Sequence, residues 1–291
     1  MNLSEYLHEQ CRLVDSALDR WVPLPSAQPE NIHKAMRYSL FAGGKRIRPI
    51  LCMSAARVVS DQVSGLEDAA CTLELIHTYS LIHDDLPALD NDDLRRGRPT
   101  CHKVFGEAMA ILAGDGMISL AFELIATDAD PLLAPKLVAE LARATGPQGM
   151  IGGQVLDMEG EQKSLRLDEL QNLHRMKTGA LLQAACRLGG IAANATEGQL
   201  SGLTLYGRYL GLAFQIVDDV LDVTASPEQM GKATGKDAAR GKNTYPALLG
   251  VDETRRQATA QLDEAVASLK PLGASADGLR SLASFVVQRQ V

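Results

Sequence analysis

Two long stretches of the chain repeat apolar residues at steps of three and four. The first repeat runs through Leu66, Ala70, Leu73, His77, Leu81 and Asp84, and the second through Tyr206, Leu210, Ala213, Val217 and Leu221. This spacing is that of one helix face. Aromatic residues make up only 4% of the chain, and alternating β-branched runs bounded by turn residues are hard to find. The sequence therefore predicts an all-α protein.

Glycine and proline residues separate the periodic stretches. They stand at Pro23 and Pro25, Gly43–Gly44, Gly97–Pro99, Gly146–Pro147 and Gly189–Gly190, and the polar stretch 226–242 is a further break. No internal repeat, low-complexity tract or shift in composition marks a boundary within the 291 residues. We therefore expect many helices joined by short loops in a single domain over residues 1–291.

The charge balance and the cysteines exclude several classes of protein. The 29 Lys and Arg against 36 Asp and Glu leave a formal charge of −7 without a long basic run, so no nucleic-acid partner is expected. Five scattered cysteines predict reduced thiols in a cytoplasmic protein rather than a zinc site or a disulfide framework. The N-terminus is acidic where a signal peptide is basic, and no apolar run approaches the roughly 20 residues of a membrane span, so no stable membrane insertion is expected.

Each of the two apolar repeats ends in a cluster of aspartates. The first cluster contains Asp84, Asp85, Asp90, Asp92 and Asp93, and the second contains Asp218, Asp219 and Asp222. Asp218 and Asp222 are four residues apart and share a helix face with Gln215. Pro87 disfavours helix, so a bend could turn Asp90 back toward Asp84. Oxygen ligands in clusters favour hard cations such as Mg²⁺, which binds one or two carboxylates together with substrate phosphates.

Cationic residues that could bind such a phosphate occur in four segments. They are Lys45, Arg46 and Arg48; Arg95, Arg96 and Arg98; Lys177 beside Thr178; and Lys232, Lys236 and Lys242. His77 lies one heptad before Asp84 and faces nearly the same way. Diphosphate is highly charged and rich in acceptors, so these residues are candidate substrate contacts. A solvated surface, a helix kink at 177–179 and an ordinary core histidine remain the alternatives for the same residues.

A di-iron carboxylate bundle is the alternative from a different functional class. Glu30 with His33, and Glu74 with His77, both match the Glu-x-x-His pattern that such a bundle needs. Glu30 directly follows a proline at an expected helix start, and two further buried glutamates are not evident. This hypothesis also leaves both aspartate clusters and their cationic neighbours unexplained.

Taken together, the motifs resemble those of the short-chain trans-prenyl diphosphate synthases, most closely the bacterial farnesyl diphosphate synthases, or geranyltranstransferases. The matching segments are 43–49, 81–90, 95–97, 152–154, 177–179, 214–222 and 242–246, in the family's order and spacing. Asp90 lies six residues after Asp84 rather than four, which is similar to the bacterial class. The segment 225–228 departs from the Gly-Asp of many members, but no ligand role depends on it.

The resemblance implies an isoprenoid-synthase-type helical bundle around a central apolar cavity, and a homodimer. It implies that Asp84, Asp90 and Asp218 hold Mg²⁺ directly, with Asp85, Asp219 and Asp222 completing the shells and three ions in each active site. The allylic diphosphate would lie between the two clusters, on Arg95, Lys177, Thr178, Gln215 and Lys232. Isopentenyl diphosphate would bind Lys45, Arg48, His77 and Arg96. The residues expected to act in catalysis are Asp84, Asp90, Lys177 and Asp218.

The implied reaction is Mg²⁺-dependent head-to-tail condensation of isopentenyl diphosphate with dimethylallyl or geranyl diphosphate. The resemblance favours Tyr79 as the floor of the cavity, whereas helix projection from Asp84 turns Ser80 toward it. A tyrosine ring with a small neighbour indicates a short cavity, and therefore mainly farnesyl diphosphate as product. Synthesis of geranyl or geranylgeranyl diphosphate remains the alternative.

Overall fold

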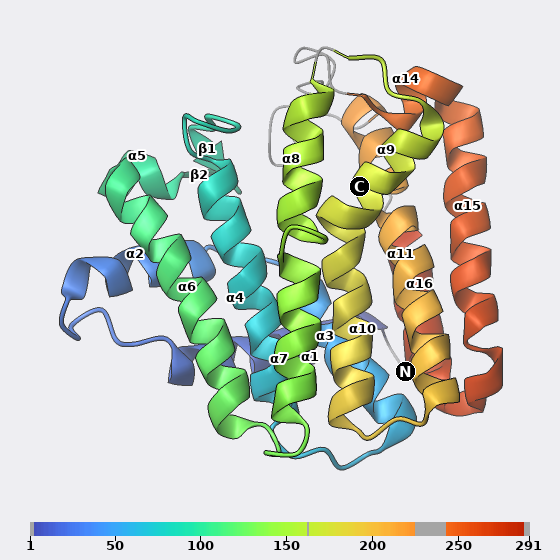
Figure 1. Cartoon of the computed structure of the whole chain (residues 1–291), viewed down its shortest axis with the longest axis horizontal. Coiled ribbons are helices and arrows are strands. Elements are labelled where there is room, and N and C mark those ends of the chain that lie inside the picture. Colours follow the sequence, from blue (N-terminus) through green and yellow to red (C-terminus); the bar gives the residue numbers. More distant parts are fainter. Residues whose placement is uncertain (1–2, 162, 225–242, 288–291) are drawn as a thin grey trace. The chain divides into compact units, whose positions relative to one another are not determined.

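The computed structural model describes residues 3–161, 163–224 and 243–287, and these residues are almost entirely helical (Figure 1). The predicted all-α class is confirmed. The chain forms two compact units: unit 1 comprises residues 1–53 and 64–138, and unit 2 comprises residues 54–63 and 139–291. A single domain over 1–291 stays a prediction.

Unit 1 is built around the predicted helix that ends at the first aspartate cluster. Its helices are α1 (Leu3–Trp21), α2 (Glu30–Leu40), the start of α3 (Ile47–Val59), α4 (Leu66–Asp84), α5 (Cys101–Phe105), α6 (Glu107–Asp128) and the start of α7 (Ala134–Thr145). A short antiparallel hairpin joins β1 (Leu94–Arg95) to β2 (Arg98–Pro99). The central helix α4 packs against α1, α2 and α6, and α6 packs in turn against α2 and α5. Figure 1 shows α4 and α6 running side by side.

The helix α4 begins and ends where the apolar repeat does. Its first turn carries Glu67 and Asp68, which complement the positive end of the helix dipole, and Asp68 accepts a 2.6 Å hydrogen bond from the Trp21 indole. Most of its residues from Ala69 to Ile82 are buried. The negative end of the dipole lies at Asp84, where further acidic residues are unfavourable unless a cation answers them. The sequence therefore places acids at a helix end where they need a partner.

Unit 2 contains the second predicted helix and the segment that carries Lys177. Its elements are the ends of α3 and α7, α8 (Met150–Gly160), α9 (Leu167–His174), the π-helix η1 (Arg175–Gly179), α10 (Ala180–Ala192), α11 (Glu197–Thr224), α14 (Tyr245–Leu249), α15 (Val251–Ser268), the 3₁₀ segment η2 (Lys270–Ala276) and α16 (Asp277–Val287). The long helix α11 packs against α10, α14, α15 and α16. The break expected at 226–242 lies outside the described residues.

The expected break at Gly189–Gly190 is wrong, because α10 runs through both glycines. A Cβ at Gly190 would lie 2.9 Å from Leu203 Cδ1, and a Cβ at Gly211 would lie 2.7 Å from Gly179 Cα. Gly190 therefore allows α10 to pack closely against α11, and Gly211 allows α11 to pack closely against η1. Neither glycine ends a helix.

The helix α6 corrects the expectation that no apolar run approaches the length of a membrane span. It has 22 residues and a mean hydropathy of 1.7 over an 18-residue window, so length and composition alone would allow it to cross a membrane. The apolar run is hard to recognise in the sequence because Asp115, with a glycine on each side, interrupts it. In the structure 39% of the window is buried, and α6 packs against α2, α4 and α5. Core helices of globular proteins share this composition.

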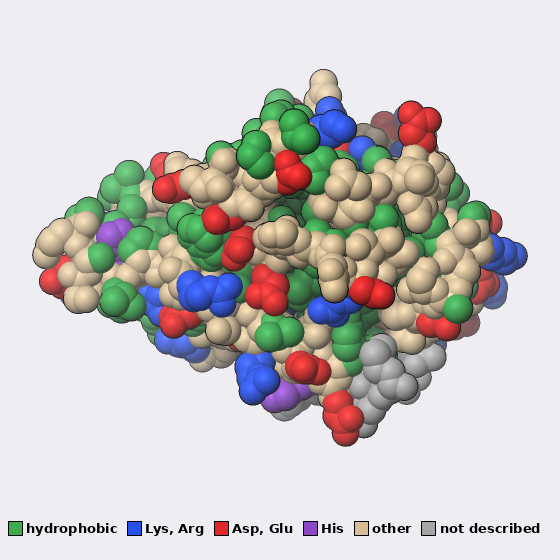
Figure 2. Space-filling model, turned by 90° about the horizontal axis from the view of Figure 1, so that it is seen from below, with side chains coloured by type: hydrophobic (Ala, Val, Ile, Leu, Met, Phe, Trp, Pro, Cys, Tyr) green, Lys and Arg blue, Asp and Glu red, His purple; other side chains and the backbone are tan. Residues whose placement is uncertain are grey.

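Figure 2 shows acidic and basic side chains interspersed over one face of the molecule, with hydrophobic side chains between them. Such mixed charge is typical of a solvated surface. Charge that is concentrated and removed from water therefore needs a separate explanation, and the structure has such charge near the end of α4.

We expect Gly211→Ala to lower the free energy of unfolding by about 1–3 kcal/mol, because the added methyl group must push α11 away from η1. Chemical denaturation with circular dichroism measures this change. Gly198→Ala is the matched control in the first turn of the same helix. Among the residues that the structure describes, none lies within 4 Å of a Cβ there, so this variant should gain about 0.4–1 kcal/mol of stability. Equal effects at both positions would contradict the packing argument.

Candidate active site

The chain folds back on itself directly after α4. The Asp90 N–H donates to the Asp84 carbonyl at 2.7 Å, and the Asp92 N–H donates to the Asp85 carbonyl at 3.2 Å. Asn91 adopts a left-handed conformation with φ of 49°, which asparagine tolerates better than most residues. The bend predicted at Pro87 is confirmed, and it brings Asp84 and Asp90 into one turn.

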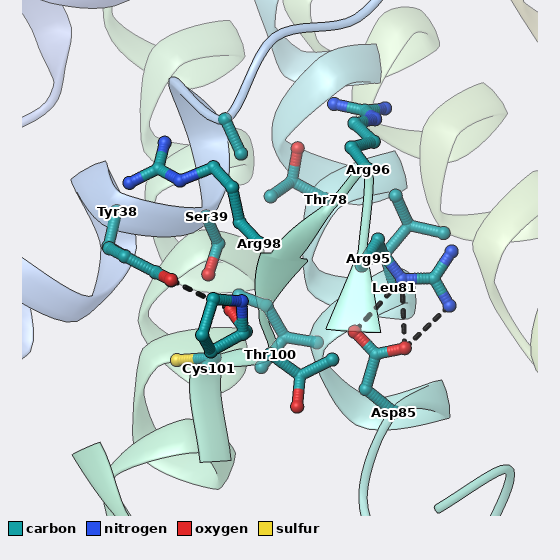
Figure 3. Close-up of a pocket in the computed structure, with 13 residues that line it drawn as sticks. Tyr38, Ser39, Thr78, Leu81, Asp85, Arg95, Arg96, Arg98, Thr100 and Cys101 are labelled. Carbon is teal, nitrogen blue, oxygen red and sulfur yellow. Dashed lines mark hydrogen bonds and ion pairs between the residues drawn. The ribbon is translucent and has the colours of Figure 1, made fainter. Parts of the chain in front are cut away.

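Asp85 and Arg95 form a two-pronged ion pair (Figure 3). The Arg95 Nε and Nη2 atoms donate to the carboxylate at 2.6–2.9 Å, and both carboxylate oxygens accept. Asp85 is only 3% exposed. Burial raises the pKa of Asp85, and the arginine acts in the opposite direction. Two residues that sequence reasoning assigned to a metal ion and to a substrate therefore contact each other in this structure.

The hairpin between β1 and β2 sends its arginines in different directions. Arg96 and Gly97 have φ of 53° and 73°, as in the tight turns that join two antiparallel strands. In Figure 3 Arg95 points toward Asp85, while Arg96 points away from it. The Arg96 guanidinium donates to the Gly43 carbonyl, and a Cβ at Gly44 would lie 2.9 Å from its Nη1 atom. The hairpin thus contacts the glycine-rich loop that precedes α3.

His77 lies in a concentrated positive field. Burial lowers the pKa of His77 well below its usual value, and four arginines lower it further. In order of effect they are Arg48, Arg96, Arg95 and Arg46. The imidazole is therefore neutral at physiological pH and can donate or accept one hydrogen bond at each nitrogen. Positive charge around a neutral, partly buried donor is an environment that favours a polyanion.

The glutamates that suggested a di-iron centre have other partners. Glu30 pairs with Lys34 at 2.5 Å on the exposed start of α2, and His33 contacts the Ala27 carbonyl. Glu74 is buried and accepts from Arg46 at 2.7 Å. Both acids of the Glu-x-x-His motifs are thus paired with cations, and the di-iron hypothesis loses its ligands.

In unit 2, three expected site residues form one hydrogen-bond chain. The Thr178 hydroxyl donates to Gln215 Oε1 at 2.8 Å, and Gln215 Nε2 donates to Asp219 Oδ1 at 3.1 Å. The other Asp219 oxygen accepts from the Tyr245 N–H at 3.0 Å. Asp219 is 4% exposed, so its carboxylate serves this internal chain. Asp218 and Asp222, on the same helix, are only half-buried.

Lys177 has a partner that sequence reasoning missed. Its Nζ lies 2.5 Å from Asp157 Oδ2, on α8. The π-helical turn η1 carries Lys177, and a Cβ at Gly153 would lie 2.2 Å from the Lys177 backbone nitrogen, so α8 and η1 are in close contact. Single π-helical turns are frequent at functional sites. The available signal was the pair of acids, Asp157 and Glu159, in the otherwise mostly apolar helix α8 that contains Gly152–Gly153–Gln154.

The two residues expected to limit product length differ in their surroundings. Tyr79 is 5% exposed, and its ring meets the His83 ring edge-on at 5.7 Å. Burial and the charge of Asp84 raise the pKa of Tyr79 to about 12. Ser80 is half-buried and donates to the His77 carbonyl at 2.9 Å. Lys232 lies outside the described residues.

A resident metal cage is absent from the described parts of the chain, since no three His, Cys, Asp or Glu side chains converge there. Mg²⁺ usually keeps several waters and takes one or two carboxylates, with substrate phosphates completing its shell. Asp84 and Asp90, gathered in one turn, are an oxygen-only donor pair of this kind. The residues therefore fit an ion that arrives with its substrate.

The Polyprenyl synthetase family model matches residues 29–274. The chain is 45% identical to a farnesyl diphosphate synthase of Geobacillus stearothermophilus over 99% of this chain and 98% of that protein. It is 46% identical to the large subunit 1 of a heterodimeric geranylgeranyl pyrophosphate synthase of Arabidopsis thaliana, over 98% of this chain and 79% of that protein.

A solved structure of a putative farnesyl-diphosphate synthase from Marinomonas sp. MED121 matches with a TM-score of 0.85 and 40% identity, covering 99% of this chain and 100% of that one. This similarity extends the family match to the helical fold of both units. The chain therefore belongs to the polyprenyl synthetase family, and its activity is that of a trans-prenyl diphosphate synthase.

Proposed function

We propose that this protein condenses isopentenyl diphosphate head to tail with dimethylallyl and geranyl diphosphate, and that its main product is farnesyl diphosphate. The observation that carries the proposal is the positive charge held in place near His77, where Glu74 binds Arg46, the Gly43 carbonyl binds Arg96 and Asp85 binds Arg95. A concentrated positive field with a hydrogen-bonding imidazole suits a diphosphate group. Synthesis of geranyl or geranylgeranyl diphosphate is the alternative, because relatives with similar identity carry different product names.

In this proposal isopentenyl diphosphate binds Lys45, Arg48, His77 and Arg96. Support comes from the hairpin and the glycine-rich loop, which Arg96 joins through the Gly43 carbonyl. Lys45 is exposed in the loop just before α3, and Arg48, in the first turn of α3, has the largest electrostatic effect on His77 after burial itself. The four groups are thus contributed by one loop, α3, one hairpin and α4.

The allylic diphosphate is proposed to bind Arg95, Lys177, Thr178 and Gln215, together with Lys232. The Gln215 amide donates to Asp219 and accepts from Thr178. Its orientation is therefore fixed before a substrate binds. Arg95 and Lys177 are held by Asp85 and Asp157, respectively. Pre-paired cations lose less side-chain freedom when a phosphate binds.

Asp84, Asp85, Asp90, Asp218 and Asp222 are the proposed Mg²⁺ ligands, with three ions expected in each active site. When bound, Mg²⁺ neutralises the charge that develops on the leaving diphosphate. In this scheme Asp84 and Asp90 act from one turn, and Asp218 and Asp222 from one face of α11. Asp85 reaches a metal ion only if it releases part of its contact with Arg95.

The proposed chemistry needs little covalent help from the chain. The allylic C–O bond breaks and leaves its electron pair on diphosphate, whose growing charge the arginines and Lys177 stabilise. The isopentenyl double bond then attacks the allylic cation, and the released diphosphate takes the proton that is lost. Apolar side chains exclude water that would otherwise trap the cation.

With isopentenyl diphosphate, an allylic diphosphate and Mg²⁺, we expect condensation products that mass spectrometry identifies, and no products with excess chelator. Asp84→Ala and Asp218→Ala should each lower kcat by about 100-fold or more, because each would remove a ligand of the Mg²⁺ that neutralises the charge on the leaving diphosphate. Steady-state kinetics with labelled isopentenyl diphosphate measures this loss.

Asp263→Ala is the matched control for both variants, because Asp263 is an exposed acid on α15. Its kcat should stay within about twofold of the unmodified protein, as is usual for surface substitutions away from a site. Near-normal turnover of Asp84→Ala or Asp218→Ala would exclude that residue as a metal ligand.

Tyr79 is the proposed limit on product length. Its ring is buried five residues before Asp84, and the contact with His83 holds its position. We expect Tyr79→Ala to shift the products toward longer chains, because the lost ring leaves space for further isoprene units. Product chain lengths by mass spectrometry measure the shift, with Tyr6→Ala as the control, since it removes a half-buried tyrosine ring from α1 rather than from α4. A profile identical to that of the unmodified protein would exclude Tyr79.

We also propose that the protein is a homodimer and that it works in the cytoplasm. The helices α5 and α6 carry three exposed apolar residues, Val104, Ile111 and Leu112, which are 45–51% exposed. Exposed apolar side chains on neighbouring elements favour association with a second surface of the same kind. The five cysteines are all free thiols, as is usual in a reducing compartment.

Leu112→Glu should convert the dimer to a monomer, because a charge in an apolar interface opposes association. Size-exclusion chromatography with light scattering measures the mass. Leu132→Glu is the control, since Leu132 is 83% exposed outside the α6 face and should leave the mass unchanged. A monomeric unmodified protein would overturn the proposal.

A further inference from the structure

The three cations of segment 45–48, where the glycine-rich loop meets α3, have different surroundings. Lys45 is exposed and Arg48 is half-buried, whereas the Arg46 side chain is only 2% exposed. The charge pattern made all three candidates for a phosphate, and the family resemblance assigned only Lys45 and Arg48 to one. The buried member of the group therefore needs a role of its own.

Arg46 is held by acceptors from three helices or their ends. Its Nε donates to Asp15 on α1 at 2.8 Å, its Nη1 to Glu74 on α4 at 2.7 Å, and its Nη2 to the Leu40 carbonyl at the end of α2 at 2.7 Å. Burial works against the charged guanidinium, but Glu74 and Asp15 hold the pKa of Arg46 above its usual value. This residue is therefore a permanent cation committed to internal contacts.

The residue that makes these contacts also has an unusual backbone conformation. Arg46 has φ of 48°, a left-handed conformation that residues other than glycine and asparagine rarely adopt. On either side, the Gly43 carbonyl accepts from Arg96, and the Lys45 carbonyl accepts from the Cys11 thiol at 3.3 Å. Side chains from α1, α4 and the hairpin thus hold the loop. Arg46, which makes most of these contacts, lies between Lys45 and Arg48 in the sequence.

Glu74 links this loop to His77. The two residues are three positions apart on α4 and therefore lie on neighbouring parts of one face. Glu74 is 2% exposed as a residue and has Arg46 as its partner at 2.7 Å. One buried carboxylate thus fixes the loop relative to the helix that carries the imidazole. The Glu-x-x-His motif here has a structural reason that does not involve iron.

We propose that Arg46 and Glu74 are positioning residues that hold Lys45 and Arg48 in register with His77 for the diphosphate of isopentenyl diphosphate. This inference rests on the proposed function, and it adds two residues that would not touch the substrate. A preorganised cationic site binds more tightly because the ordering cost is met on folding. Loosening the loop should therefore weaken the binding of isopentenyl diphosphate and leave the binding of the allylic substrate unchanged.

The test uses Glu74→Gln in the full-length protein, with Glu140→Gln as the matched control. Glu140 is 8% exposed and forms the comparable buried pair with Arg187, at 2.7 Å in unit 2. We expect both variants to lower the melting temperature. Only Glu74→Gln should raise KM for isopentenyl diphosphate, by at least tenfold, while KM for geranyl diphosphate and kcat stay within about threefold.

Two further variants keep the test decisive if Glu74→Gln folds poorly. Arg46→Lys retains the charge but not the three-pronged geometry, and Asp15→Asn removes the half-exposed partner. We expect each to raise KM for isopentenyl diphosphate about threefold to tenfold. Isothermal titration with isopentenyl diphosphate alone gives the same comparison without turnover. If none of these variants changes that affinity more than Glu140→Gln does, the positioning role is overturned.

Lys45→Ala and Arg48→Ala separate this inference from the proposed function. If both leave KM for isopentenyl diphosphate unchanged, the assigned substrate site is wrong, and the positioning role falls with it. If they raise KM while Glu74→Gln, Arg46→Lys and Asp15→Asn behave like Glu140→Gln, the site stands and only the positioning role is wrong.

Discussion

Compensation of buried positive charge is the constraint on which the structure around α4 depends. Arg46 and Arg95 are both removed from solvent to a large extent, and each meets a carboxylate that is almost fully buried, Glu74 and Asp85. A buried charge without a partner costs several kcal/mol, so these pairs determine where the loop before α3 and the hairpin after α4 lie. The arginine field around His77 is a consequence of that arrangement.

Unit 2 organises its polar residues by hydrogen bonds and close helix packing instead. Asp219 accepts from the Tyr245 backbone and from Gln215, and Gln215 accepts from Thr178, so α11, α14 and η1 share one polar chain. The contact of η1 with α11 is close because glycine meets glycine there. The 2.8 Å hydrogen bond between Thr178 and Gln215 thus depends on the glycines at this contact, Gly179 beside Thr178 and Gly211 one turn before Gln215.

Local rules account for what sequence reasoning predicted well. The repeat from Leu66 to Asp84 gave the bounds of α4, and the restriction imposed by Pro87 led to the return of Asp90 toward Asp84. Errors arose where a residue's role depends on distant neighbours. Gly189–Gly190 resembles a break until α11 is seen packed against α10, and Glu74 resembles a metal ligand until Arg46 is seen beside it.

The helical class, the two aspartate clusters and the set of candidate cations can be read from the amino-acid sequence, because periodicity and residue chemistry are local properties. Which of the charges pair internally depends on the fold. Lys45 and Arg46 are neighbours in sequence, yet one is exposed and the other is buried between α1 and α4. The physical reason is that desolvation and ion pairing depend on the surroundings of a side chain, and those surroundings come from segments far away along the chain.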